Sequence, residues 1–87
     1  MRAVVTVIGK DMVGILAKVS TICAEANANV LEVTQSILQE YFAMIMVIDI
    51  SSLNCELNAL EEKLQNNVEG MRIHVMHEDI FNSMHRI

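Results

Sequence analysis

Apolar and polar residues follow two different periods along the first half of the chain. Residues 3–8 are β-branched or apolar at every position and are followed by Gly9, which predicts a strand buried on both faces. From Met12 to Ala26 the apolar residues recur every three or four positions, as in an amphipathic helix. Residues 27–29 are rich in asparagine and predict a turn.

The second half predicts three more strands and two more helices. Residues 31–38 alternate between apolar and polar, which predicts a half-buried strand at a sheet edge. After a tight turn at Gln39-Glu40, residues 41–51 are apolar on both faces and predict a second central strand. Leucines at helical spacing predict a helix over 53–68, capped by Ser52 or Asn54. Residues 71–76 predict a last strand, and residues 79–87 a short helix capped by Asp79.

The predicted order is β-α-β-β-α-β, which indicates an α+β fold of the ferredoxin-like type. We expect a four-stranded antiparallel sheet with two helices on one face and a short C-terminal helix. The first and third strands are central in that topology, in agreement with their apolar character on both faces. A chain of 87 residues holds one hydrophobic core, so residues 1–87 are expected to form a single domain.

Composition narrows the possible partners. The net charge is −5 and the six Lys and Arg residues are scattered, which argues against direct binding of nucleic acid. Hydrophobic residues make up 53% of the chain, and the two helices cover only one face of the predicted sheet. We therefore expect a homodimer in which a second subunit covers the apolar residues on the other face of the sheet. No apolar run is long enough to span a membrane, so a cytoplasmic protein without membrane contact is expected.

Candidate catalytic and metal-binding residues are sparse. Cys23 and Cys55 are too far apart in sequence for a metal motif, and Cys23 is expected to be a buried free thiol. His74 and His77 are predicted to point to opposite faces of one strand, and His85 lies beyond it. No Ser or Cys has a neighbouring His in a predictable geometry. We expect no catalytic residue, no metal and no cofactor, and the protein is not expected to be an enzyme.

Three other functions of this topology fit the residues poorly. RNA-binding forms use exposed aromatic residues on the sheet and a basic surface, but the chain has only Tyr41, Phe42 and Phe81 and is acidic. Copper-carrying forms need a Cys-x-x-Cys pair after the first strand, where this sequence has none. Acylphosphatase-like forms need an arginine in that loop, where Lys10 is followed at once by Asp11.

The loop after the first strand, residues 9–14, is the most informative segment. Gly14 is expected in the first turn of the helix, where glycine is unfavourable unless another group approaches the backbone closely. The N–H groups of that turn suit a carboxylate, and Asp11 could accept from an ammonium group, so a zwitterion would fit. The same residues are equally compatible with an ordinary turn in which Asp11 is the N-cap.

The sequence resembles the ACT domain, a regulatory module of amino-acid metabolism that senses small molecules. The resemblance covers the whole chain and is carried by residues 9–19 and 26–33. The family's loop commonly has Asp or Asn, any residue, Pro and Gly; Asp11 and Gly14 match it, and Val13 stands in place of the Pro. Residues 41–49 and 80–87 are similar to bacterial stand-alone single-ACT proteins, which resemble the repeats of the glycine cleavage system transcriptional repressor.

This resemblance implies a ligand site shared between two subunits. The matching positions on one subunit are Gly9, Lys10, Asp11, Met12, Val13, Gly14, Ile15 and Leu16, and those on the other are Asn29, Val30 and Leu31. Asn29 could bind the ligand's backbone groups or serve as a turn residue with positive φ. We expect a regulatory homodimer that binds an amino acid or related metabolite and signals to a partner protein. The alternative is an interaction module without a ligand.

Overall fold

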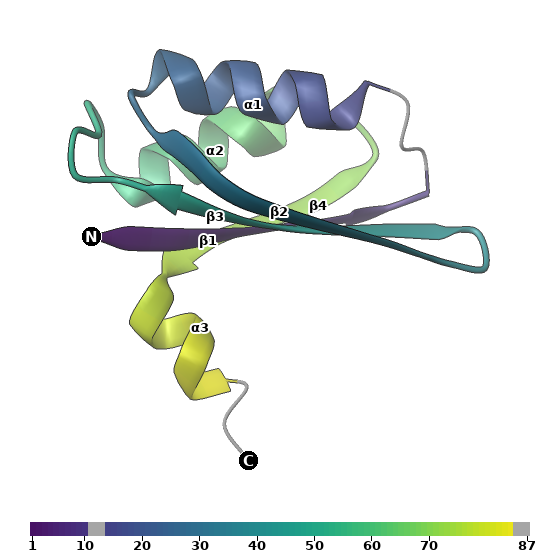
Figure 1. Cartoon of the computed structure of the whole chain (residues 1–87). Coiled ribbons are helices and arrows are strands. Elements are labelled where there is room, and N and C mark those ends of the chain that lie inside the picture. The colour runs from purple at the N-terminus through teal and green to yellow at the C-terminus, as the bar shows by residue number, and fades with distance from the viewer. Residues whose placement is uncertain (11–13, 85–87) are drawn as a thin grey trace.

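The backbone forms one antiparallel sheet with two helices packed on one face. The structure is a computed structural model that describes residues 1–10 and 14–84. In chain order the elements are β1 (Arg2–Gly9), α1 (Ile15–Glu25), β2 (Asn29–Leu38), β3 (Tyr41–Asp49), α2 (Leu57–Asn67), β4 (Met71–His77) and α3 (Glu78–Met84). The strand order β2-β3-β1-β4 confirms the ferredoxin-like prediction and the central positions of β1 and β3. Figure 1 shows α1 and α2 together above the sheet.

The core lies between this helical layer and the sheet. Alternate residues of the two central strands point into it, because Val5 is paired with Met46 and Val7 with Met44 across the β1–β3 ladder, and all four are fully buried. Helix α1 adds apolar side chains from its inner stripe, and α2 does the same. The fully buried helical side chains are Val19, Cys23, Leu60 and Leu64.

The described starts of both long helices lie later than the predicted ones. Helix α1 is described from Ile15 with Gly14 as its N-cap; the predicted start at Met12 and the predicted cap at Asp11 lie outside the described residues. Helix α2 starts at Leu57 with Glu56 as N-cap and without a side-chain cap. The predicted cap Asn54 instead donates its Nδ2 to the Glu25 carbonyl at 3.0 Å, which ties the end of α1 to the loop before α2.

The outer edge of β4 is closed by side chains of α2. Gln65 donates its Nε2 to the Met71 carbonyl oxygen at 2.6 Å and accepts the Ile73 N–H at 3.0 Å through Oε1. Glu61 accepts the Val75 N–H through its Oε1 at 2.7 Å. These bonds satisfy backbone groups that an edge strand otherwise offers to another chain. The edge of β4 is therefore poorly suited to pairing with a second sheet.

The other edge strand, β2, carries exposed apolar side chains. Leu31 is 45%, Val33 37% and Ile37 61% exposed, so in the single chain the predicted half-burial of this strand is wrong. The β2–β3 hairpin extends beyond the N-terminal end of α1, as Figure 1 shows, and a register shift between Val30 and Glu32 interrupts the ladder. Val30 still packs against the core, but Leu31, Val33 and Ile37 remain exposed in the single chain.

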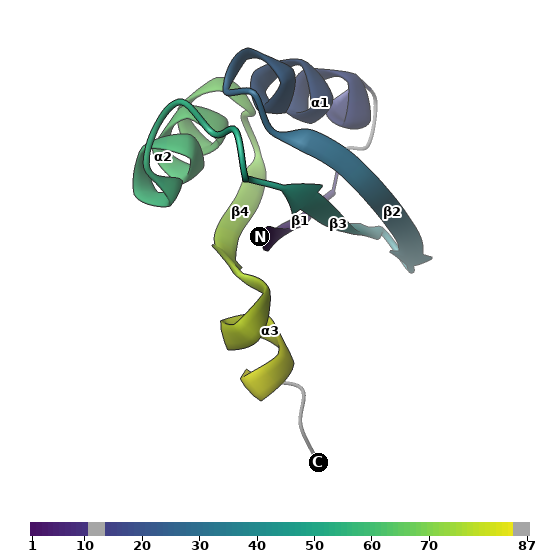
Figure 2. The same ribbon diagram turned by 60° about the vertical axis from the view of Figure 1, so that its left-hand side comes forward.

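The second face of the sheet is only partly covered. Helix α3 follows β4 directly and lies on the side opposite α1 and α2, as Figure 2 shows. An ion pair of 2.7 Å between Arg2 Nη2 and Glu78 Oε2 holds its start against β1. Val4 is buried on this face but Ile8 is 51% exposed, so β1 is not buried on both faces along its whole length. We call the face of the sheet opposite α1 and α2, which carries Val4 and Ile8, the open face.

Candidate functional site

The turn at Gly14 has a backbone conformation that explains its glycine. Its φ is 73°, in the left-handed region, where side chains with a Cβ are strained. Sequence reasoning placed Gly14 inside the first helical turn and attributed the glycine to close approach by another group. In the structure it is instead the residue before the helix, and no atom of the described residues lies within 4 Å of the position that a Cβ would take. The left-handed backbone, rather than crowding within the chain, requires the glycine.

Among residues 1–10 and 14–84, nothing accepts from the first backbone N–H groups of α1, which lie beside this glycine. The first helical bond after the N-cap runs from the Lys18 N–H to the Gly14 carbonyl at 3.0 Å, so the N–H groups of residues 15–17 have no acceptor within the helix. The helix has no side-chain cap and no acidic residue in its first turn. Ile15 is buried and anchors the helix to the core, whereas Leu16 is 38% exposed. The turn thus combines positive partial charge with an accessible apolar side chain.

Gly9 and Lys10 lie at the end of the sheet where β1 leads towards Gly14 and α1. Gly9 is the last residue of β1 and is paired with Phe42 and Met71. A Cβ on Gly9 would overlap the sulfur of Met71 and lie 2.7 Å from the Gly70 carbonyl oxygen, a backbone atom that cannot move aside as the methionine side chain can, so packing requires glycine here. Lys10 is exposed, with its Nζ 3.8 Å from Glu40 Oε1 and 5.6 Å from the centre of the Tyr41 ring.

The predicted residues of β2 lie at the opposite end of the sheet. Asn29 is paired with Asp49, which is in turn paired with Arg2 at the start of β1. Within one chain, Asn29, Val30 and Leu31 are therefore separated from Gly9 and Gly14 by the length of the sheet. Asn29 is the first residue of β2 and not a positive-φ turn residue; that conformation belongs to Asn27, with φ 61°.

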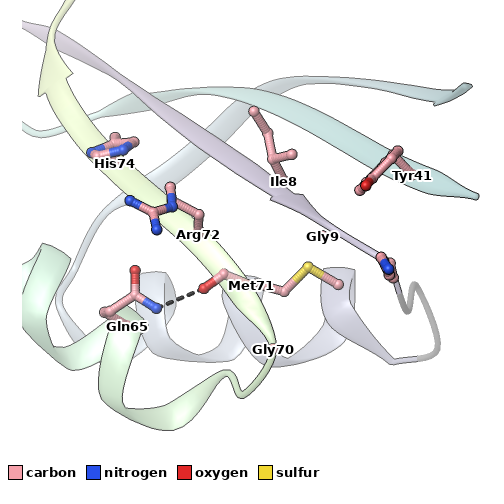
Figure 3. Close-up of a pocket in the computed structure, with 9 residues that line it drawn as sticks. Ile8, Gly9, Tyr41, Gln65, Gly70, Met71, Arg72 and His74 are labelled. Carbon is pink, nitrogen blue, oxygen red and sulfur yellow. Dashed lines mark hydrogen bonds between the residues drawn. The ribbon is translucent and has the colours of Figure 1, made fainter.

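A basic hollow on the open face is lined by Gly9 and Lys10, which the sequence analysis names as ligand-binding candidates, and by residues of β3 and β4 that it does not. It has a volume of about 700 Å³ and lies where β1 ends and β4 begins. Figure 3 shows Ile8 from β1, Tyr41 from β3, and Arg72 and His74 from β4 around it. Together with Lys10 these residues bring cationic and aromatic side chains to one place, although they are far apart in sequence. Only the strand register, which places Ile8 opposite Arg72, could have revealed it.

Other chemical features of the described residues are few. Residues 1–10 and 14–84 contain no group of three or more His, Cys, Asp or Glu side chains placed to hold a metal ion. Cys23 is a buried free thiol, as predicted, and burial raises its pKa to about 11. The Ser51 N–H, 2.9 Å from Asp49 Oδ1, lowers the pKa of that exposed carboxyl. None of the helices in the described part of the chain is long and apolar enough to cross a membrane.

Comparison with known proteins finds a matching family profile and similar proteins along the whole chain. The sequence profile of the ACT domain matches residues 2–78. A UPF0237 protein of Clostridium perfringens is 49% identical over 92 residues, covering 100% of both chains. A UPF0237 protein of Methanopyrus kandleri is 44% identical over 88 residues, covering 99% of this chain and 98% of its own.

Two solved structures place the fold among known ones. An ACT domain protein from Streptococcus pneumoniae superposes with a TM-score of 0.79 at 32% identity, covering 93% of each chain. A putative glycine cleavage system transcriptional repressor superposes with a TM-score of 0.64 at 20% identity, covering 85% of this chain and 43% of the other. At that identity the second likeness concerns the fold alone.

Proposed function

The chain belongs to the ACT domain family, and from this membership we propose that it is a homodimeric, single-domain sensor that binds a free amino acid between its subunits. ACT domains are generally regulatory domains that bind small molecules and often dimerise. The proposal adds the dimer, the ligand class and the position of the site. Ligand occupancy would then be passed to a partner protein that the dimer contacts.

The two sheet edges support a dimer formed through β2. The edge of β4 is closed by Gln65 and Glu61, whereas β2 spans 29–38 and exposes Leu31, Val33 and Ile37. A long edge strand with exposed apolar side chains favours pairing with another strand. A two-fold axis beside β2 would join the two sheets into one and bury the same apolar side chains on both subunits.

Such pairing would also bring the two parts of the predicted site together, residues 9–16 of one subunit and residues 29–31 of the other. The end of β2 lies at the same end of the sheet as Gly9, because Ile37 is paired with Phe42, and Phe42 with Gly9. Two β2 strands related by a two-fold axis run antiparallel, so the start of one lies beside the end of the other. Asn29 of the partner subunit then approaches the end of the sheet that carries Gly14. The separation of these residues within one chain is what a shared site requires.

The uncapped first turn of α1 beside Gly14 carries the proposed ligand class. A carboxylate accepts from free N–H groups at a helix N-terminus, where the helix dipole is also favourable. The amide of Asn29 of the partner subunit offers a donor and an acceptor for the ligand's ammonium and carboxylate groups. The exposed Leu16 offers apolar contact for the ligand's side chain.

A thermal-shift screen against the common amino acids tests this proposal. A ligand at a hundred times its dissociation constant stabilises the folded state by about 2.7 kcal/mol. For a domain of this size that corresponds to a rise in Tm of roughly 10 °C or more. If no amino acid raises the Tm of the wild-type protein, the proposed ligand class is wrong.

The variant Gly14→Asn tests the position of the site. Asparagine tolerates the left-handed backbone, and the space around Gly14 is empty, so the fold should accept it. The matched control is Gly70→Asn, because Gly70 has φ 76° and equally empty space but lies in the α2–β4 turn. We expect Gly14→Asn to lose the amino-acid response and Gly70→Asn to keep it. Equal responses from the two variants would place the ligand elsewhere.

An interaction module without a ligand remains the second candidate. It is favoured by α3, which exposes Ile80 by 52% and Met84 by 65% on the open face. In that case Gly14→Asn would leave partner binding unchanged, whereas Ile80→Ser would weaken it.

A further inference from the structure

The basic hollow continues into an apolar groove under α3. The groove has a volume of about 370 Å³ and is lined by residues of β1, β3, β4 and α3, among them Ile45, Met76 and Phe81. Ile8 and His74 line both cavities, so the two are adjacent on the open face. One end of the combined cavity is basic and the other is apolar.

The charge at the basic end differs from that of the protein as a whole. The chain has a net charge of −5, yet the lining of the hollow includes Lys10 and Arg72 and no acidic residue. Lys10 is 3.8 Å from Glu40, a long contact between two exposed side chains that solvent weakens. Arg72 is exposed and forms no ion pair within residues 1–10 and 14–84, so its guanidinium is available to an anion.

The apolar end suits an aliphatic chain or an aromatic ring better than water. Ile45 is 38% exposed on β3 and Met84 is 65% exposed on α3, so both present apolar surface at the groove. Burying such surface removes it from water and favours binding of an apolar group. His74 lies where the two ends join, with its Nδ1 3.9 Å from Glu61 Oε1.

From this arrangement we propose a second ligand site on the open face, which binds a free amphiphilic anion. The carboxylate or phosphate head lies between Lys10 and Arg72, and the apolar body extends past Ile8 into the groove under α3. Arginine pairs with either head group through parallel hydrogen bonds. This site borders the proposed amino-acid site at Gly9 and Lys10, but its cavity lies on the open face rather than at the first turn of α1.

Isothermal titration of the full chain with matched probes tests both ends of this site. Octanoate and octyl phosphate carry the two head groups, octanol has the same chain without charge, and acetate has the charge without the chain. We expect octanoate or octyl phosphate to bind at least about tenfold more tightly than octanol and acetate. Equal binding of octanol, or no binding by either anion, would overturn the proposal.

Two variants separate the head contact from a general charge effect. Arg72→Gln should weaken binding of the tighter anion by about tenfold or more, because a hydrogen-bonded ion pair is lost. Lys63→Gln removes the same charge on the exposed surface of α2 and should change binding less than twofold, as expected for a remote solvated charge. Equal losses in the two variants would show a nonspecific charge effect and contradict the site.

A third variant and a membrane control test the groove. Ile45→Gln should weaken octanoate binding several-fold and leave acetate binding unchanged. Vesicles containing phosphatidylglycerol provide the other source of the same head-group chemistry. If the protein binds these vesicles but neither free anion, the open face is a membrane surface and the proposed site is wrong. Retained octanoate binding by Gly14→Asn would confirm that the two sites are separate.

Discussion

Replacing Gln65 with methionine tests whether the α2 side chains hold the edge of β4. The substitution keeps the length of the side chain and a good helix former, but it removes both hydrogen bonds to the backbone at Met71 and Ile73. Each such bond contributes about 0.5–1.5 kcal/mol net, and these two are only partly buried. We therefore expect a loss of about 1–2 kcal/mol in the free energy of unfolding.

Calorimetry at one fixed protein concentration measures this effect. A loss of this size corresponds to a fall in Tm of roughly 4–16 °C for a domain of this length. Glu62→Met provides the matched control, because Glu62 is exposed on the same helix and makes no recorded hydrogen bond or ion pair among the described residues. If Gln65→Met lowers Tm no more than Glu62→Met does, the two bonds do not stabilise the edge and the argument for a closed β4 edge is refuted.

Three further predictions follow from packing and burial. Gly9→Ala should cost about 1–3 kcal/mol in urea unfolding, because its Cβ would overlap the Met71 sulfur; an unchanged midpoint would contradict this packing. Stability should be constant up to about pH 9 and fall by about 2–3 kcal/mol toward pH 11, because burial raises the Cys23 pKa from 9.0 to about 11 and the thiol must stay protonated in the fold. Cys23→Ala should show no such fall from this group. Ile37→Lys should shift the protein toward monomer in sedimentation experiments, and an unchanged dimer would exclude β2 as the interface.

The order of elements was predictable because burial imposes a period on the sequence. Residues 41–49 alternate between the core and the open face, and the strand appears where the alternation does. Helix starts were less predictable, since an apolar residue such as Met12 or Leu53 fits a helical stripe whether or not the backbone is helical there. Gly14 marked the true start of α1, but only its left-handed conformation distinguishes a cap from a first turn.

The features missed by the sequence analysis depend on contacts between distant residues. The sequence analysis assigns no role to Glu61 or Gln65, because nothing local shows that they reach the backbone of β4. Arg72 and Tyr41 likewise line the same hollow only because of the register of three strands. Ile37 shows the opposite error. The alternation of apolar and polar residues along β2 predicts that Ile37 is buried, but in one chain its side chain is exposed.

The proposed site shared between subunits is tested most directly by mixing two inactive variants. Gly14→Asn damages the α1 side of the site and Asn29→Ala the β2 side, so each homodimer should fail to bind the amino acid found in the screen. After the two proteins are unfolded together and refolded, a heterodimer has one site with both wild-type halves. We expect calorimetric titration of the mixture to recover about a quarter of the wild-type sites at wild-type affinity, as random pairing gives. A mixture that stays as inactive as the two variants, while the wild-type protein binds, would contradict a site built from both subunits.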